Sequence, residues 1–263
     1  MIVEDHFRNR VSPYWVRFAL GNGQIELTPH TVRFSLEGAT ADQVSDAEID
    51  DHRHHDRDHL PWLPPLKMVV RARTSHPSGE LLGTAGFGFW NEPSGWEKGL
   101  VAPPNSVWFF YASPPSDMVF VPDVPGHGWK AAMVNGGRAN ALTMALGRWL
   151  MELPVARRLV YHLGQSRLNA AEKVLADVDM TAWHTYTLHW LPERAIFAVD
   201  GREVFRADNP PRVRLGFVAW LDNQYAVVKP DGEISFGLLD VPQRQWLELD
   251  YVRIEREALR RKT

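Results

Sequence analysis

AIFAVDGREVF, residues 195–205, carries the strongest fold signal in the sequence. Two short runs of apolar and β-branched residues flank Asp200-Gly201, and an Asp-Gly pair is preferred in the type I′ turn that joins two antiparallel strands. Similar short runs, separated by Gly, Pro, Asn and Asp, fill most of the remaining chain. Regular turn signals between short strands are typical of β-sandwiches and β-barrels, so we expect an all-β fold.

The segments that we expect to form strands have either alternating polarity or a wholly apolar composition. They are Gln24–Leu27, Thr31–Leu36, Ser45–Asp51, Lys67–Arg73, Thr84–Trp90, Ser106–Tyr111, Trp183–Trp190, Ile196–Val199, Val213–Trp220 and Trp246–Glu255. In the last segment, strict alternation places one set of residues on a common face: Trp246, Glu248, Asp250, Val252 and Ile254.

Residues 138–176 depart from this pattern, because glycine becomes sparse and Ala, Leu, Arg, Glu and Lys dominate. Apolar residues recur at helical spacing in Asn140–Leu153, and Pro154 suits the first turn of a second helix. Ala170–Leu175 could form a third, short helix. We therefore expect a helical insertion between two strands, which could close over a site as a lid, pack on the sandwich or form a homodimer interface.

The composition excludes several classes of function. The chain has 263 residues, enough for the one large domain that we expect over residues 1–263, and 29 Lys+Arg against 32 Asp+Glu give a net charge of −3. This charge does not favour nucleic acid or anionic membranes as partners. The absence of cysteine excludes disulfides, thiolate zinc sites and cysteine nucleophiles. Met1–Trp15 is too polar for a signal peptide, so we expect a cytoplasmic protein.

Three segments carry a resemblance to a known family. They are Trp183–Trp190 (WHTYTLHW), the Ile196–Val204 hairpin around Asp200-Gly201, and Leu249–Ile254 (LDYVRI). They resemble the closing strands of concanavalin A-like lectins and glucanases, above all the family-16 glycoside hydrolases. The resemblance implies a jelly-roll β-sandwich in which one concave sheet forms the ligand groove. It also implies that a structural calcium could bind on the convex side through Asp250; we expect no other cofactor.

The chain departs from the family at the strand that carries the catalytic residues. Family members place two glutamates on one strand, in a Glu-x-Asp-x-Glu type of motif, and retaining hydrolysis needs two carboxyl groups about 5 Å apart. By segment order the equivalent strand is Ser106–Tyr111, and Val101–Ser116 contains no Asp or Glu. We therefore expect no retaining β-glucanase activity.

Other residues could serve a groove that lacks those glutamates. As catalytic candidates we take Asp222, Glu48, Asp50 and Tyr225, since carboxyl and phenol groups exchange protons. As substrate-binding candidates we take Trp90, Trp108, Phe110, Trp129, Trp220, Lys130, Asn135 and Asn223, because aromatic walls with a few polar groups are typical of ligand pockets. The alternatives are aromatic residues buried between the sheets, and a turn in which Asp222 or Asn223 bonds its own backbone.

Asp46–His59 (DAEIDDHRHHDRDH) is rich in histidine and carboxylate side chains. Such side chains can bind zinc or another divalent metal, but a metal site needs ligands held in fixed geometry. We favour a short strand over Ser45–Asp51, with Glu48 and Asp50 pointing to one surface, followed by a hydrated loop.

Two functions remain open from the sequence. The first is an enzyme of the isomerase, lyase or hydrolase type that acts on a small metabolite or glycoside by acid/base chemistry. The second is a non-catalytic, lectin-like protein that binds carbohydrate on its aromatic side chains. A weaker third option is an interaction module that assembles through the insertion.

Overall fold

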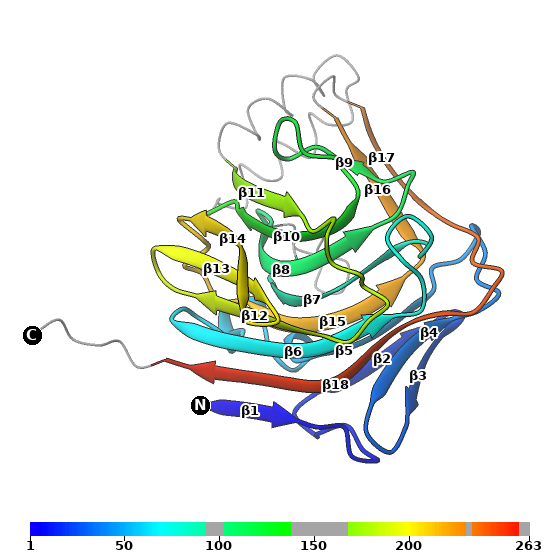
Figure 1. The fold of residues 1–263 in the computed structure, drawn as a ribbon, viewed down its shortest axis with the longest axis horizontal. Coiled ribbons are helices and arrows are strands. Elements are labelled where there is room, and N and C mark those ends of the chain that lie inside the picture. Colours follow the sequence, from blue (N-terminus) through cyan, green and yellow to red (C-terminus); the bar gives the residue numbers. More distant parts are fainter. Residues whose placement is uncertain (93–101, 138–167, 230–232, 258–263) are drawn as a thin grey trace, which may run out of the picture.

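A computed structural model of the protein describes residues 1–92, 102–137, 168–229 and 233–257, and in this part of the chain the fold is all β (Figure 1). Two antiparallel sheets make up the body of the molecule, as the sequence predicts. No helix in the described residues is long and apolar enough to cross a membrane.

The first sheet has eight strands in the order β14-β13-β12-β6-β18-β4-β3, with β1 paired to β18. The strands are β1 (Ile2–Asp5), β3 (Gly23–Leu27), β4 (Val32–Leu36), β6 (Leu66–Thr74), β12 (His184–Trp190), β13 (Arg194–Val199), β14 (Arg202–Asp208) and β18 (Gln245–Arg256). The predicted hairpin is confirmed, because β13 pairs with β14 across Asp200 and Gly201, which have φ angles of 50° and 79°. Both angles are the positive values that a type I′ turn needs.

The second sheet has seven strands in the order β11-β10-β8-β7-β15-β5-β2. They are β2 (Val16–Leu20), β5 (Asp46–Asp50), β7 (Thr84–Trp90), β8 (Asn105–Ala112), β10 (Gly128–Asn135), β11 (Asn169–Val174) and β15 (Gly216–Asp222). A small third sheet contains β9 (Asp117–Met118), β16 (Gln224–Val228) and β17 (Ile234–Leu238), which lie beyond one end of the second sheet in Figure 1.

The core lies between the two large sheets and is rich in aromatic rings. Phe109 of β8 packs against Tyr186 of β12 with ring centroids 5.0 Å apart and against Phe197 of β13 at 5.4 Å. Trp62 and Trp190 are fully buried in the same core. The chain has 11 tryptophans among its 263 residues. Some of them therefore serve packing, since large aromatic side chains bury the most apolar area per residue.

The expected helical insertion is corrected where the structure describes it. Ala170–Leu175 does not form a short helix; residues 169–174 form strand β11, which pairs with β10. Pairing with a neighbouring strand here overrides the helix preference of Ala, Glu and Lys. The rest of the expected insertion, residues 138–167, lies outside the described residues.

The face expected for the last strand is also corrected. The register of β18 against β6 shifts between Leu249 and Tyr251, so Asp250 forms a β-bulge. One extra residue reverses the alternation, and the buried side chains change from Leu247 and Leu249 before the bulge to Val252 and Ile254 after it. Trp246 and Val252 are therefore on opposite faces of the sheet. The alternation of side chains between the two faces is interrupted at Asp250, and nothing in the sequence marks this position.

Candidate functional site

One face of the seven-stranded sheet is turned away from the core and carries the candidate site. On β8, Val107, Phe109 and Tyr111 are fully buried toward the core, whereas Trp108 and Phe110 point to the opposite side and stay partly exposed. We call this opposite side the aromatic face. The register of the sheet places further side chains on it: Trp90, Trp220, Asp222, Asp46, Glu48, Asp50, Lys130 and Glu172.

Four rings on the aromatic face form one cluster. Trp108 stacks on Phe110 with centroids 5.2 Å apart and planes 18° from parallel. Trp220 lies 5.3 Å and Trp90 lies 6.1 Å from Trp108, both tilted. These four predicted binding residues therefore share a surface on the side of the sheet away from the core. Trp129, by contrast, is corrected: it is only 3% exposed and packs between the sheets, 5.8 Å from Phe87.

Two glycines of β7 make room for this cluster. Gly86 pairs with Phe110 and Trp220, and Gly88 pairs with Trp108. A Cβ atom on Gly86 would come within 2.9 Å of Trp220, and one on Gly88 within 2.5 Å of the Trp108 Cα. The bare backbone of β7 is therefore a floor beneath the Trp220 indole and against the Cα and Cβ atoms of Trp108.

Three carboxylates alternate along β5 beside the aromatic cluster. Asp46, Glu48 and Asp50 all point to the aromatic face, which confirms the expected short strand with Glu48 and Asp50 on one surface. The Arg53 guanidinium binds both Glu48 and Asp50 and lies 3.9 Å from the centre of the Phe18 ring. Two of the predicted catalytic carboxylates thus share one internal cation.

The same segment contains a group of metal-ligand type. Ligand atoms of Glu48, Asp50 and His52 all lie within 4.8 Å of one another, and all three residues are buried. The expected hydrated loop is therefore wrong at His52, which is 2% exposed, although all of residues 53–59 are partly or fully exposed. The donor set would suit a divalent cation, but Arg53 already supplies positive charge there.

Asp222 and Asp46 are cross-strand partners at one end of the aromatic face. Asp222 accepts hydrogen bonds from the backbone and hydroxyl of Thr84 and from the backbone and amide of Gln224, at 2.9–3.2 Å. Burial raises the pKa of Asp222 to about 6. Burial and the neighbouring Asp222 charge raise the pKa of Asp46 well above its usual range. Such a pair tends to share one proton.

Other polar candidates have structural partners instead. Asn223 donates to the carbonyls of three loop residues and accepts from the Ser45 backbone, so it joins loops below the surface. Asn135, at the end of β10, donates to the Asn209 carbonyl. Tyr225 lies in β16 of the third sheet, where its ring covers Gly237.

Calcium does not fit Asp250. This carboxylate binds the Arg71 guanidinium. The group of three potential metal ligands found in the described part of the chain is the one around Glu48 and does not include Asp250. Calcium needs six to eight oxygen ligands, so an arginine at a single carboxylate argues against the site that the family resemblance implies.

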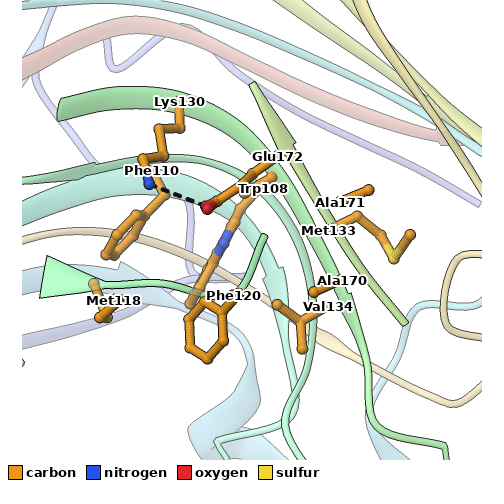
Figure 2. Close-up of a pocket in the computed structure, with 11 residues that line it drawn as sticks. Trp108, Phe110, Met118, Phe120, Lys130, Met133, Val134, Ala170, Ala171 and Glu172 are labelled. Carbon is orange, nitrogen blue, oxygen red and sulfur yellow. Dashed lines mark hydrogen bonds and ion pairs between the residues drawn. The ribbon is translucent and has the colours of Figure 1, made fainter. Parts of the chain in front are cut away.

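Sequence reasoning missed Glu172 altogether. This residue on β11 forms an ion pair with Lys130 on β10, and both lie at a small cavity beside Trp108 and Phe110 (Figure 2). Lys130 was a predicted binding residue, but its partner lies in a segment expected to be helical. The pairing of β10 with β11 alone brings the two charges together.

Comparisons with known proteins identify the fold. No protein-family model and no curated protein matches the sequence. Among solved structures, a β-1,3-1,4-glucanase (lichenase) from a mouse hindgut metagenome matches with a TM-score of 0.53 and 15% identity, covering 97% of this chain and 99% of that one. A Bacillus licheniformis β-glucanase matches with a TM-score of 0.51 and 13% identity, covering 97% of this chain and 98% of that one. A Crh5 transglycosylase in complex with NAG matches with a TM-score of 0.52 and 11% identity, covering 98% of this chain and 84% of that one. The chain therefore has the jelly-roll fold of the family-16 glucanases, as its closing strands indicate.

Proposed function

We propose that the protein binds a carbohydrate on its aromatic face and does not cleave it by the retaining glucanase route. The observation that carries this proposal is the cluster of Trp108, Phe110, Trp220 and Trp90 on the floor of Gly86 and Gly88. By segment order, β8 is the strand on which the resembling glucanases carry their carboxylates, and here it has none.

Aromatic rings suit a carbohydrate because the C–H faces of a sugar ring are apolar and pack flat on them. The fold supports the same class of ligand, since the neighbours named above act on glucans or, in one case, hold NAG. Charged groups on both sides of the cluster, on β5 and on β10–β11, would supply the hydrogen bonds that fix a sugar in one orientation.

The ion pairs and hydrogen bonds that the predicted catalytic groups already make within the protein favour binding over catalysis. Glu48 and Asp50 are held by Arg53, and Asp222 accepts four hydrogen bonds. Tyr225 lies in a different sheet. A retaining mechanism needs a nucleophile and an acid/base group free to reach the same anomeric centre, and β8 supplies neither.

A second function, acid/base chemistry on a small metabolite or glycoside, is favoured by one observation. The pKa of Asp222 is about 6, and Asp46 has a raised pKa and a buried Oδ1 atom with no hydrogen-bond partner in the described residues. A carboxylic acid kept protonated near neutral pH can act as a general acid. Replacing Asp46 by Asn tests this second function. An enzyme that uses Asp46 would lose most of its turnover and keep its binding, whereas a binding protein would show no turnover in either form and would keep its binding.

The proposal is tested by titrating the protein with β-glucan oligosaccharides and following tryptophan fluorescence and heat. We expect Trp108→Ala to abolish binding and Trp246→Ala to leave it unchanged, because Trp246 lies on the outer face of the other sheet beside Arg33 and Arg73. Melting temperatures of both variants show that each one folds. Binding that survives Trp108→Ala would overturn the proposal.

A further inference from the structure

Lys130 and Glu172 form a buried ion pair on the aromatic face. The Lys130 Nζ and Glu172 Oε2 atoms are 3.1 Å apart, and the side chains are only 2% and 7% exposed. Removing two charges from water is costly, and their attraction repays the cost only when the remaining polar atoms also find partners. The surroundings of the second carboxylate oxygen are therefore informative.

That second oxygen, Glu172 Oε1, is buried and has no hydrogen-bond partner in the described residues. Burial raises the pKa of Glu172, although the neighbouring Lys130 acts in the opposite direction. A buried acceptor without a donor is costly, and native structures keep few of them. Such an atom indicates a place where a bound group completes the hydrogen bonding.

Glu172 lines a cavity of about 50 Å³ together with Lys130, Trp108 and Phe110. Figure 2 shows the ion pair beside these two rings, with Met118 and Phe120 from the β9 region on the other side. This volume holds a few water molecules or one small polar group, but no whole sugar ring. A ligand on the aromatic cluster would therefore place only one substituent here.

The charges select which substituent fits. The two charges already balance each other, so an ammonium group on Glu172 would also meet the Lys130 charge, and a carboxylate group on Lys130 would also meet the Glu172 charge; neither gains a net attraction that offsets its loss of water. A hydroxyl group donates one hydrogen bond and accepts others, so it can satisfy both partners at once.

We propose that Lys130 and Glu172 form a subsite for a hydroxyl-bearing substituent of a neutral sugar whose ring stacks on Trp108. The hydroxyl donates to Glu172 Oε1 and accepts from Lys130 Nζ. The subsite selects neutral sugars against amino sugars and uronic acids, and it rests on the proposed carbohydrate-binding function.

The test uses three probes of matched length: a neutral β-glucan hexasaccharide, a glucosamine hexamer and an oligogalacturonate. The decisive variant is Lys130→Met with Glu172→Leu, because replacing both members of a buried pair by apolar residues leaves no unpaired charge and preserves folding. The control removes an exposed pair on β14 with Glu203→Gln and Arg206→Gln.

We expect the native protein and the control to prefer the neutral probe. The double variant at 130 and 172 should melt at the same or a higher temperature and bind the neutral probe about tenfold to a hundredfold more weakly. If Trp108→Ala abolishes binding and the double variant leaves it unchanged, the subsite is overturned and the proposed function stands. If none of the three probes binds, the proposed function fails and the subsite fails with it.

Discussion

Asp222 and Asp46 face each other as direct cross-strand partners on β15 and β5, and both are held in a buried setting that favours the protonated form. Two like charges at this separation repel each other, so the pair binds a proton more tightly in the folded protein than in the unfolded chain. The relationship makes the stability of the fold sensitive to pH, whether or not the pair takes part in chemistry.

The first prediction concerns that sensitivity. Because the pKa of Asp222 rises to about 6 on folding, the folded state holds more protons than the unfolded state between about pH 4 and pH 6. The free energy of unfolding should therefore fall as pH rises through this range. Asp46→Asn removes one of the two charges. It should therefore reduce the fall in the free energy of unfolding between pH 4.5 and pH 7 by about 1–3 kcal/mol.

Urea unfolding at the two pH values measures this difference. Asp42→Asn serves as the control, because Asp42 is an exposed carboxylate near the same strand. An Asp46→Asn variant with the same pH dependence as the native protein would contradict the assignment of the coupling to this pair.

A second prediction follows from the position of Arg53 between Glu48 and Asp50. Arg53→Met leaves two buried carboxylates without their cation and should lower the free energy of unfolding by about 3–5 kcal/mol. With the guanidinium removed, Glu48, Asp50 and His52 have the spacing of a divalent-cation site. Zn²⁺ should then raise the melting temperature of the variant, since a ligand that binds only the folded state stabilises it.

Native protein and the Arg53→Lys variant are the controls for zinc, because both keep a positive charge at the site. A melting temperature that rises equally in all three proteins would locate zinc elsewhere and contradict the competition between Arg53 and a metal ion.

A third prediction tests the glycine floor. Gly88→Ala places a Cβ within 2.5 Å of the Trp108 Cα, and it does so at a φ of 153°, which side chains rarely adopt. We expect a loss of about 1–3 kcal/mol, together with weaker carbohydrate binding as Trp108 is displaced. Gly79→Ala is the matched control, because Gly79 also has a positive φ but nothing within 4 Å of its Cβ position. Calorimetry and the binding titration separate the two effects: the control should lose stability and keep binding.

The sequence predicts the strands well where local signals are strong. The Asp200-Gly201 turn and the alternation in residues 84–90 are local features, and β7 and β13 have the expected bounds to within two residues. Alternation on β8 also predicts that Trp108 and Phe110 share one face of the strand, because residues two apart point to the same side in either register.

The errors arise where tertiary contacts decide. Trp129 lies in GWKAAMVN, whose strand β10 is buried on both sides, so periodicity does not tell which side faces the core. Glu172 lies in a segment with helix-favouring residues that becomes a strand only by pairing with β10. The bulge at Asp250 changes the face of every later residue of β18 without any glycine or proline to mark it.

The last prediction concerns Asp51, which is 1% exposed and holds the end of β5 to β15. Its Oδ2 accepts from the Trp62 indole at 2.6 Å and its Oδ1 accepts from the Phe217 backbone at 2.7 Å. Asp51→Asn offers one acceptor and one donor to two donors, so one N–H group loses its partner. We expect a loss of about 1–3 kcal/mol near pH 5, measured by urea unfolding.

The pH dependence of the same variant gives an independent check. Burial raises the pKa of Asp51 to about 8, so the native carboxyl gains a proton on folding between about pH 4 and pH 8, and the free energy of unfolding falls as pH rises through that window. An asparagine does not titrate, so the variant should lose this slope while the slope from Asp222 below pH 6 remains. The deficit of the variant should therefore be larger at pH 5 than at pH 8. A deficit that is equal at both pH values would show that Asp51 stays ionised throughout, with its two hydrogen bonds outweighing burial.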